Sequence, residues 1–346
     1  MNDKVNHSNV KYPSTGQFRN AIHNLKSALT FVSVDDNNNA IYDTTKELPK
    51  IEFVGTVKVH GTNASLIMFE DQTIYCQSKE RLLSFGYDNA GFWEAMQHIE
   101  TKELFDKVKT QYLKLNNKEP EYPIIIAGER AGKSIQKGVA VSEVDKFFMI
   151  FGVKVGNLWL PIEDYHINKP EDRIFHALDF PSFEVTIDLN NPAEIQNTLI
   201  SFTESVENEC PVGKQLGAVD CLIGEGIVWK PKTTPWCDNS GYWFKVKGEK
   251  HSSSKVKKLA SVDVEKLNSI KDFVDYAVTE SRLQQGLTEI GLDMKKMGEF
   301  IKWISQDVFK EESDTMKENN LEMKDIGKEL SNKARKWYIE QYNSAV

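Results

Sequence analysis

Residues 57–63, Val-Lys-Val-His-Gly-Thr-Asn, carry side chains suited to covalent chemistry on a phosphate. Lys58 is placed to act as a nucleophile, Gly61 lets the backbone approach a phosphate closely, and Asn63 adds a short polar side chain. A lysine attacks only as the free amine, so such a site must favour the neutral form through desolvation or neighbouring cations. A surface lysine before a turn is the commoner explanation of a lone lysine near a glycine. The interpretation of Lys58 therefore depends on the segments downstream of it in the chain.

Two later segments offer charged groups for a nucleotide or a nucleic-acid end. Residues 76–81, Cys-Gln-Ser-Lys-Glu-Arg, end a predicted strand with two cations, Lys79 and Arg81. Either or both could clamp a terminal phosphate, since arginine offers a bidentate fork; a solvated strand end is the alternative. Glu129 comes after the apolar run 124–127 and is flanked by a glycine and an arginine. It could accept hydrogen bonds from ribose hydroxyls or hold a metal-bound water, or it could be a salt-bridged turn residue.

Residues 225–231, Glu-Gly-Ile-Val-Trp-Lys-Pro, place an acid and a cation on one predicted strand. Glu225 and Lys230 are five positions apart and so point to opposite faces unless a bulge intervenes, which Gly226 could permit. A carboxylate beside a lysine nucleophile and a magnesium ion could act on both. An exposed strand with unrelated charges is the alternative for this segment taken alone.

Two further strands complete the set of candidate residues. Residues 147–153 form an aromatic run in which one ring, such as that of Phe151, could stack on a purine, although most of its members must be core. Lys245 and Lys247 share one strand face by the period of two and could grip an α-phosphate as pyrophosphate departs. The lysine-rich stretch immediately after them, residues 250–258, is the only strongly basic one in the chain.

Taken in chain order, as a lysine, an acid on a strand, an aromatic strand, Glu-Gly-Ile-Val-Trp-Lys and Lys-Val-Lys, the segments resemble those of the covalent nucleotidyltransferase superfamily of polynucleotide ligases and messenger-RNA capping enzymes. His60 stands where DNA ligases and capping enzymes usually carry aspartate, which is similar to the nick-sealing RNA ligases of the phage RNA ligase 2 and RNA-editing ligase type. The resemblance covers about residues 10–250. It departs from the family at Val57, where some relatives have an acid, and at Ser-Lys-Glu-Arg in place of Ser-Arg.

The resemblance implies a role for each matching position. Lys58 would carry the AMP, Glu129 would contact the ribose or the metal shell, and Phe151 would stack on adenine. Glu225 and Lys230 would organise the metal and the phosphates, and Lys245 and Lys247 would hold the α-phosphate. Asn63 and Lys79 or Arg81 would serve the RNA phosphate or the later steps, and the role of His60 is left open. The implied catalytic residues are Lys58, Glu225, Lys245 and Lys247. The implied cofactor-binding residues are Val57, Lys58, His60, Asn63, Lys79, Arg81, Glu129, Phe151, Glu225, Lys230, Lys245 and Lys247, with Glu225 and Glu129 as metal ligands.

The sequence pattern predicts an α+β fold. Between about residues 50 and 250, short β-branched and aromatic runs alternate with turn residues, with helices near 92–113 and 192–206. Beyond residue 258 the apolar residues recur with helical spacing in three stripes. The resemblance implies an adenylyltransferase domain over 1–258, with ATP-grasp-like antiparallel sheets and flanking helices, and a small all-helical domain over 259–346. An oligonucleotide-binding fold is not visible at the C-terminal end.

The composition is that of a globular protein, with 40% hydrophobic and 27% charged residues and a net charge of −8. The four cysteines lack zinc-type spacing and are expected to be reduced thiols without disulfides. The start of the chain has no apolar signal core and no run is long enough to span a bilayer, so a cytoplasmic or other intracellular location without a membrane partner is expected. The acidic balance leaves room for a local basic groove.

The function implied by the resemblance is ATP-dependent ligation of RNA 3′-hydroxyl and 5′-phosphate ends. It would run through lysyl-AMP and RNA-adenylate intermediates with Mg²⁺, or Mn²⁺, as the metal, and nicked duplex RNA is the expected partner. The alternatives are a capping-type guanylyltransferase, a DNA ligase, or a catalytically inactive protein that binds RNA ends.

Overall fold

The computed structural model divides into two compact units, residues 1–246 and residues 247–346. It describes residues 7–36, 38–248, 270–318 and 321–345. The predicted domain boundary at residues 258/259 and the lysines of the stretch 250–258 lie outside the described residues. Each unit is considered by itself below.

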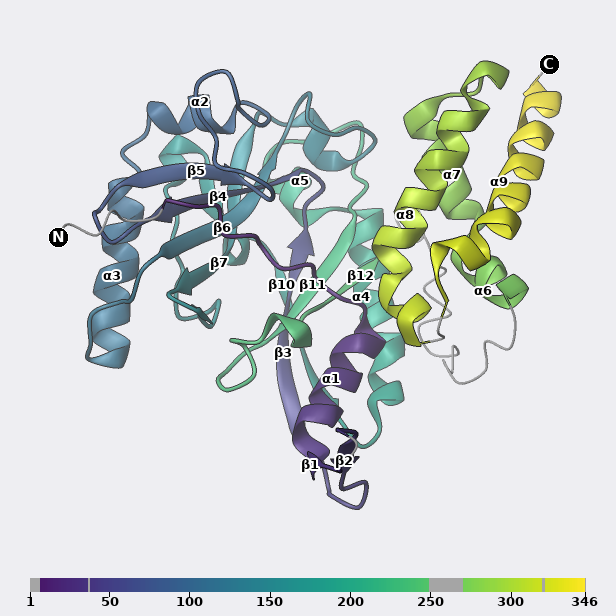
Figure 1. Cartoon of the computed structure of the whole chain (residues 1–346). Helices are drawn as coiled ribbons and strands as arrows, with labels where there is room; N and C mark the ends of the chain where they lie inside the picture. The colour runs from purple at the N-terminus through teal and green to yellow at the C-terminus, as the bar shows by residue number, and fades with distance from the viewer. Residues whose placement is uncertain (1–6, 37, 249–269, 319–320, 346) are drawn as a thin grey trace. The chain divides into compact units, whose positions relative to one another are not determined.

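Two mainly antiparallel sheets form the centre of the first unit (Figure 1). The first sheet has the order β10-β3-β11-β12, and the second has β5-β4-β6-β7-β8 with β9 parallel to β7. A separate hairpin pairs β1 with β2. The strands are β1 Phe31–Val34, β2 Ala40–Tyr42, β3 Lys50–Lys58, β4 Thr62–Met68, β5 Ile74–Ser78, β6 Ile124–Ala131, β7 Phe147–Val155, β8 Leu158–Trp159, β9 Ile174–His176, β10 Ser182–Asp188, β11 Gly226–Pro231 and β12 Phe244–Lys247.

Helices cover one face of each sheet. Alternate residues of β4, β6 and β7, such as Leu66, Ile126 and Ile150, join a core with the apolar faces of α2 and α3. On the four-stranded sheet, Trp229 and Phe244 stack in parallel, Phe18 of α1 packs on Phe244, and α4 lies beside β11. The opposite face of the second sheet carries a smaller apolar cluster that includes Ile67, Ile125 and Ala127, and the polar pair Asn63 and Glu129 lies on the same face.

The helices of the first unit differ from the sequence expectation at one point. The predicted helix near 92–113 is two helices, because the chain leaves the helix at His98 and Glu100 then caps a new start by accepting from the Lys102 N–H at 3.2 Å. The α-helices are α1 Phe18–Thr30, α2 Phe92–Gln97, α3 Lys102–Asn116, α4 Gln196–Asn208 and α5 Pro211–Gln215. The 3₁₀ turns are η1 Ala140–Glu143, η2 Pro170–Asp172, η3 Ala177–Asp179, η4 Pro192–Ile195 and η5 Ser240–Tyr242.

The described part of the second unit is helical, as the periodicity predicts. It contains α6 Ile270–Ala277, α7 Glu280–Ile290, η8 Met294–Lys296, α8 Met297–Glu318 and α9 Met323–Ala345. Phe300, Ile304, Leu330 and Tyr338 are fully buried in its core. The α+β class with a helical C-terminal region is therefore confirmed, although α7 was not foreseen. Among the described residues, no helix is long and apolar enough to cross a membrane.

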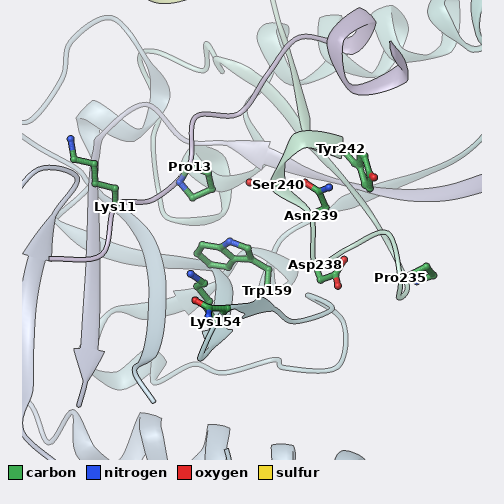
Figure 2. Close-up of a pocket in the computed structure, with 10 residues that line it drawn as sticks. Lys11, Pro13, Lys154, Trp159, Pro235, Asp238, Asn239, Ser240 and Tyr242 are labelled. Carbon is green, nitrogen blue, oxygen red and sulfur yellow. The ribbon is translucent and has the colours of Figure 1, made fainter. Parts of the chain in front are cut away.

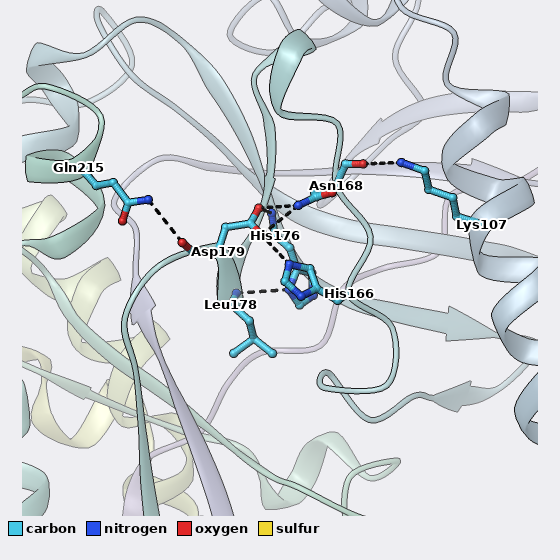
Figure 3. A network of polar contacts seen from close by, with 7 residues as sticks. All are labelled: Lys107, His166, Asn168, His176, Leu178, Asp179 and Gln215. Carbon is cyan, nitrogen blue, oxygen red and sulfur yellow. Dashed lines mark hydrogen bonds and ion pairs between the residues drawn. The ribbon is translucent and has the colours of Figure 1, made fainter.

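A polar network ties the loop before β9 to the turn η3 just after that strand (Figure 3). The Asp179 carboxylate accepts hydrogen bonds from the Asn168 amide and from the His176 backbone N–H, and it pairs with the His166 ring. His176 itself is 1% exposed, and its Nδ1 accepts from the Leu178 N–H at 3.2 Å. Burial, reinforced by the neighbouring His166, lowers the pKa of His176 to about 3.

Acid should destabilise this unit through His176. Between its unfolded pKa of 6.5 and its folded pKa of about 3, the unfolded chain binds a proton that the native protein does not. The free energy of unfolding should then fall as pH falls, by up to about 1.4 kcal/mol per pH unit. His176→Asn keeps an acceptor for Leu178 without titrating, so urea unfolding should show a shallower pH slope for the variant. His98→Asn, at an exposed ring, serves as control, and equal slopes for wild type and His176→Asn would contradict the argument.

Candidate active site

The end of β3 and the start of β11 bring Lys58 and Glu225 together. Lys58 is paired with Gly226 in the sheet, and its Nζ donates to Glu225 Oε2 at 2.8 Å. Gly226 has φ of 147°, a conformation that favours glycine, and the regular strand begins there. Glu225 therefore lies before the regular alternation of β11. The pairing of β11 with β3 is regular from Gly226 to Pro231, so the bulge considered at Gly226 is not present within the strand. The Glu225 carboxylate reaches Lys58 from just before this regular pairing.

The same carboxylate oxygen also contacts the histidine of the lysine segment. His60 Nδ1 lies 3.2 Å from Glu225 Oε2. The Glu225 side chain is only 4% exposed, whereas those of Lys58 and His60 are 23% and 26% exposed. A buried carboxylate requires charged or hydrogen-bonding partners, and both come from residues 58–60. The sequence left the role of His60 open. In the structure its ring contacts the Glu225 carboxylate and helps to fix its position.

Glu129 approaches this pair from the other sheet. It lies on β6 opposite Asn63 of β4 and accepts from the Gly61 backbone N–H. Burial raises the pKa of Glu129 to about 7; the charge of Lys58 opposes this shift and that of Glu225 adds to it. The sequence prediction that Glu129 belongs near the lysine agrees with this geometry.

Two buried polar atoms near Glu129 lack partners. Asn63 Oδ1 and Ser65 Oγ form no hydrogen bond within the part of the chain that the structure describes. Asn63 and Ser65 share the sheet face that carries Glu129, because they are paired with Glu129 and Ala127 respectively. Unsatisfied buried polar atoms are uncommon, and here they suit a ligand with hydroxyl or amino groups. Ser65 was not singled out from the sequence.

The two lysines of β12 face the same side as Lys58. Phe244 packs against Phe53 and Trp229 on the apolar face of the four-stranded sheet, so Lys245 and Lys247 must project from the other. Lys58 lies on that other face, because it alternates with the buried Val57 along β3. The predicted shared face of the two lysines is therefore present. The Val57 side chain points into the core, which leaves only its backbone for contact with a ligand.

Phe151 is an extra residue in β7. The pairing of β6 with β7 shifts between Ala127, opposite Gly152, and Gly128, opposite Ile150, so Phe151 bulges out of the ladder. Its ring is partly exposed and meets Tyr12 edge-on at 5.0 Å between centroids. Tyr12 also contacts Trp159 and Trp243. These four rings form what we call the aromatic box.

Lys230 lies in the aromatic box. Its Nζ donates to the Phe151 backbone carbonyl at 2.8 Å and lies 4.1 Å from the ring centroid of Trp243. The side chain is 7% exposed, and burial lowers its pKa to about 7. These contacts differ from the predicted role of Lys230 in organising metal and phosphates.

The two candidate cations after β5 point to different partners. Lys79 Nζ donates to Ser14 Oγ at 3.4 Å, and Arg81 lies over the Tyr87 ring at 5.8 Å. Arg81 is exposed and Lys79 is partly buried. The geometry does not rank one above the other as a phosphate ligand.

The carboxylates of the site suit a hard cation that also takes ligands from water and from the phosphates of a bound substrate. Within the described ranges, no three His, Cys, Asp or Glu side chains converge as metal ligands. Glu225 and Glu129 supply carboxylate oxygens on both sides of Lys58. Magnesium is commonly bound through one or two carboxylates together with water and substrate phosphates, so these residues fit it. The four cysteines are free thiols.

A pocket of about 480 Å³ adjoins the aromatic box. Figure 2 shows the Trp159 ring at its centre, between Pro13 and Lys154. The remaining lining residues are Lys11, Asn157, Pro235, Asp238, Asn239, Ser240 and Tyr242. The Trp159 ring belongs to both the pocket lining and the aromatic box, because it also touches Tyr12 and Trp243.

Comparison with known proteins decides the family. A family model described as RNA ligase matches residues 51–247, more than half of the chain. The chain belongs to the RNA ligase family. The matched range begins one residue after the start of β3 and ends with β12, so it contains every element that supplies Lys58, Glu129, Glu225, Lys245 and Lys247.

Solved structures of an RNA ligase from Naegleria gruberi are also similar. A variant with ATP and Mn is 15% identical, with 74% of this chain and 61% of that chain covered and a TM-score of 0.43. A variant with AMP and Mn is 16% identical, with 74% and 60% covered and a TM-score of 0.42. The chain thus spans about three fifths of the length of these ligases.

Tyr12, Trp159 and Trp243 are the site neighbours that sequence reasoning missed. Tyr12 lies in an aromatic and basic segment near the start of the chain, at residues 11–20. Its contact with Phe151 joins segments far apart in the chain, and no local pattern encodes such a pairing. The only available signal was the density of tryptophan and phenylalanine around the matched segments.

The turn after Lys58 should tolerate only glycine. A Cβ on Gly61 would lie 2.3 Å from the Arg130 carbonyl oxygen. Gly61→Ala must therefore displace the turn and lower the free energy of unfolding by about 1–3 kcal/mol. Gly16→Ala is the control, since its nearest contact would be an ordinary 3.6 Å. Urea unfolding that gave the same loss for both variants would contradict this account.

Proposed function

We propose that this protein is an ATP-dependent RNA ligase that joins an RNA 3′-hydroxyl to a 5′-phosphate. The observation that carries the proposal is the contact of Lys58 Nζ with the buried Glu225 at 2.8 Å, with Glu129 on the facing sheet. Membership of the RNA ligase family supports it. We further propose that residues 1–258 form the adenylyltransferase domain and residues 259–346 a helical domain.

The reaction begins with attack of Lys58 Nζ on the α-phosphorus of ATP. Nζ gives up a proton, for which the adjacent Glu225 carboxylate is the acceptor. A P–N bond forms, the bond from the α-phosphorus to the oxygen bridging it to the β-phosphate breaks, and pyrophosphate leaves. Glu225 orients Nζ and is itself held by His60. Lys245 and Lys247, which project from the same sheet face as Lys58, neutralise charge on the α-phosphate as the bond breaks.

Two further displacements complete the ligation, the first of which passes the AMP to RNA. The RNA 5′-phosphate attacks the lysyl-AMP phosphorus and frees Lys58. The 3′-hydroxyl next attacks the activated 5′-phosphate, which forms the phosphodiester bond and releases AMP. Positioning and electrostatics carry most of such phosphoryl transfers. Glu129 and Asn63 would hold the nucleotide ribose, and Phe151 the adenine.

Glu225 and Glu129 would hold a Mg²⁺ or Mn²⁺ ion through their carboxylate oxygens. The ion would neutralise phosphate charge. The preference for a nick in duplex RNA rests on His60 in the lysine segment, which is typical of nick-sealing RNA ligases, and on the helical C-terminal region.

Covalent labelling tests the nucleophile. Incubation with α-labelled ATP and magnesium should leave label on the wild-type protein and none on Lys58→Ala, because the P–N bond cannot form. Lys50→Ala is a matched control on the same strand, where Lys50 only pairs with Asp188 at 3.5 Å, and it should label normally. Label retained on Lys58→Ala would refute the assignment.

The substrate class requires a separate assay. We expect ligation of a nicked RNA duplex to exceed that of a bridged break or of single-stranded ends, and label from ATP to exceed label from GTP. Efficient sealing of a DNA nick alone would identify a DNA ligase, and labelling by GTP a capping-type enzyme. Binding of RNA ends without any label would identify an inactive end-binding protein.

A further inference from the structure

The burial of Lys230 requires an explanation beyond the predicted phosphate contact. Among the described residues, no carboxylate lies within ion-pair distance of its Nζ. Its neighbours are the rings of Trp243, Phe151 and Tyr12, at 4.1, 5.4 and 5.9 Å from Nζ. Burying a lysine without an acid beside it costs free energy. We therefore expect its amine to make a polar contact that an apolar side chain could not make.

The Phe151 carbonyl lies at a point of β7 where none of the described strands pairs with β7 on the side away from β6. On the side away from β6, β7 pairs with β9 over Phe148–Ile150 and with β8 over Lys154–Val155. The bulged Phe151 falls between these two stretches. Its carbonyl accepts a hydrogen bond from Lys230 Nζ at 2.8 Å. The amine thus replaces the backbone N–H that a neighbouring strand would otherwise donate.

Gly152 makes room for this contact. A Cβ at Gly152 would lie 3.3 Å from Lys230 Nζ and 3.4 Å from the Trp159 ring. Both distances are about the closest that ordinary side-chain contacts allow, so a larger residue would press the amine away from the carbonyl. Phe151, Gly152 and Lys230 therefore form one structural unit.

We propose that Lys230 is a positioning residue, which fixes the bulge of β7 through the Phe151 carbonyl so that the Phe151 ring is held for the adenine base. The inference rests on the proposed function, because it requires that ATP binds here. Lys230 then contributes to the binding of the base and leaves the transfer of the phosphate to Lys58, Lys245 and Lys247.

The test compares single and double variants in the labelling reaction with ATP. Lys230→Met should raise the half-saturating ATP concentration about tenfold, the order expected for loss of one stacked base, with the maximal rate within about twofold of wild type. Phe151→Ala should have a similar effect. The double variant should be no worse than Phe151→Ala alone, because Lys230 acts through that ring.

Inorganic tripolyphosphate, which lacks a base, separates the two possible roles. Its inhibition of labelling should be unchanged in Lys230→Met. Weaker inhibition, or a loss of maximal rate at unchanged half-saturation, would mean that Lys230 serves the phosphates and would overturn the inference. Fully additive effects of Lys230→Met and Phe151→Ala would overturn it as well.

Two further variants guard against a general loss of structure. Gly152→Ala keeps the lysine but crowds its amine, so it should also raise the half-saturating ATP concentration. Lys232→Met alters a lysine two residues along, which pairs with Glu163 and Glu184, and should behave as wild type. Thermal unfolding checks that each variant folds. Wild-type protein that is not labelled by ATP would refute the proposed function and this inference together, whereas normal ATP dependence of Lys230→Met would refute the inference alone.

Discussion

The candidate site depends on one buried carboxylate. Glu225 is almost fully enclosed, so its charge must be met by fixed partners, and these are Lys58 and His60. The three side chains come from the end of β3 and the start of β11. Their meeting therefore depends on the register of the two strands, since a slip of one residue would move every side chain of β11 to the other face. The long apolar face of the sheet, with Trp229 and Phe244 stacked in it, fixes that register.

The two sheets contribute different chemistry to the site. The four-stranded sheet supplies lysines from its polar face, and the second sheet supplies Glu129 with the unsatisfied Asn63 and Ser65. Helices cover one face of each sheet, and the candidate site residues lie on the opposite faces, where Glu129, Asn63 and Ser65 stand beside the apolar Ile67 and Ile125. Packing and chemistry thus depend on the same period of two.

That period is also why the sequence predicts so much of the structure. It predicts most of the strands and the shared face of Lys245 and Lys247, whereas β1, β2, β9 and β10 were not foreseen. It does not predict the contact of Tyr12 with Phe151 or the insertion of Lys230 between rings, because those contacts join distant segments across two sheets. The break between α2 and α3 was missed because local capping by Glu100 overrode a continuous apolar stripe.

Burial shifts the pKa values of two groups of the site in opposite directions. It raises the pKa of the acid Glu129 and lowers that of the base Lys230, each to about 7, so both shifts favour the uncharged form. Lys58 is held in a different way, by the 2.8 Å contact of its Nζ with Glu225 Oε2 and by the register of β3 with β11. The fold therefore positions Lys58 through packing and strand pairing, whereas burial acts on the pKa values of Glu129 and Lys230 around it.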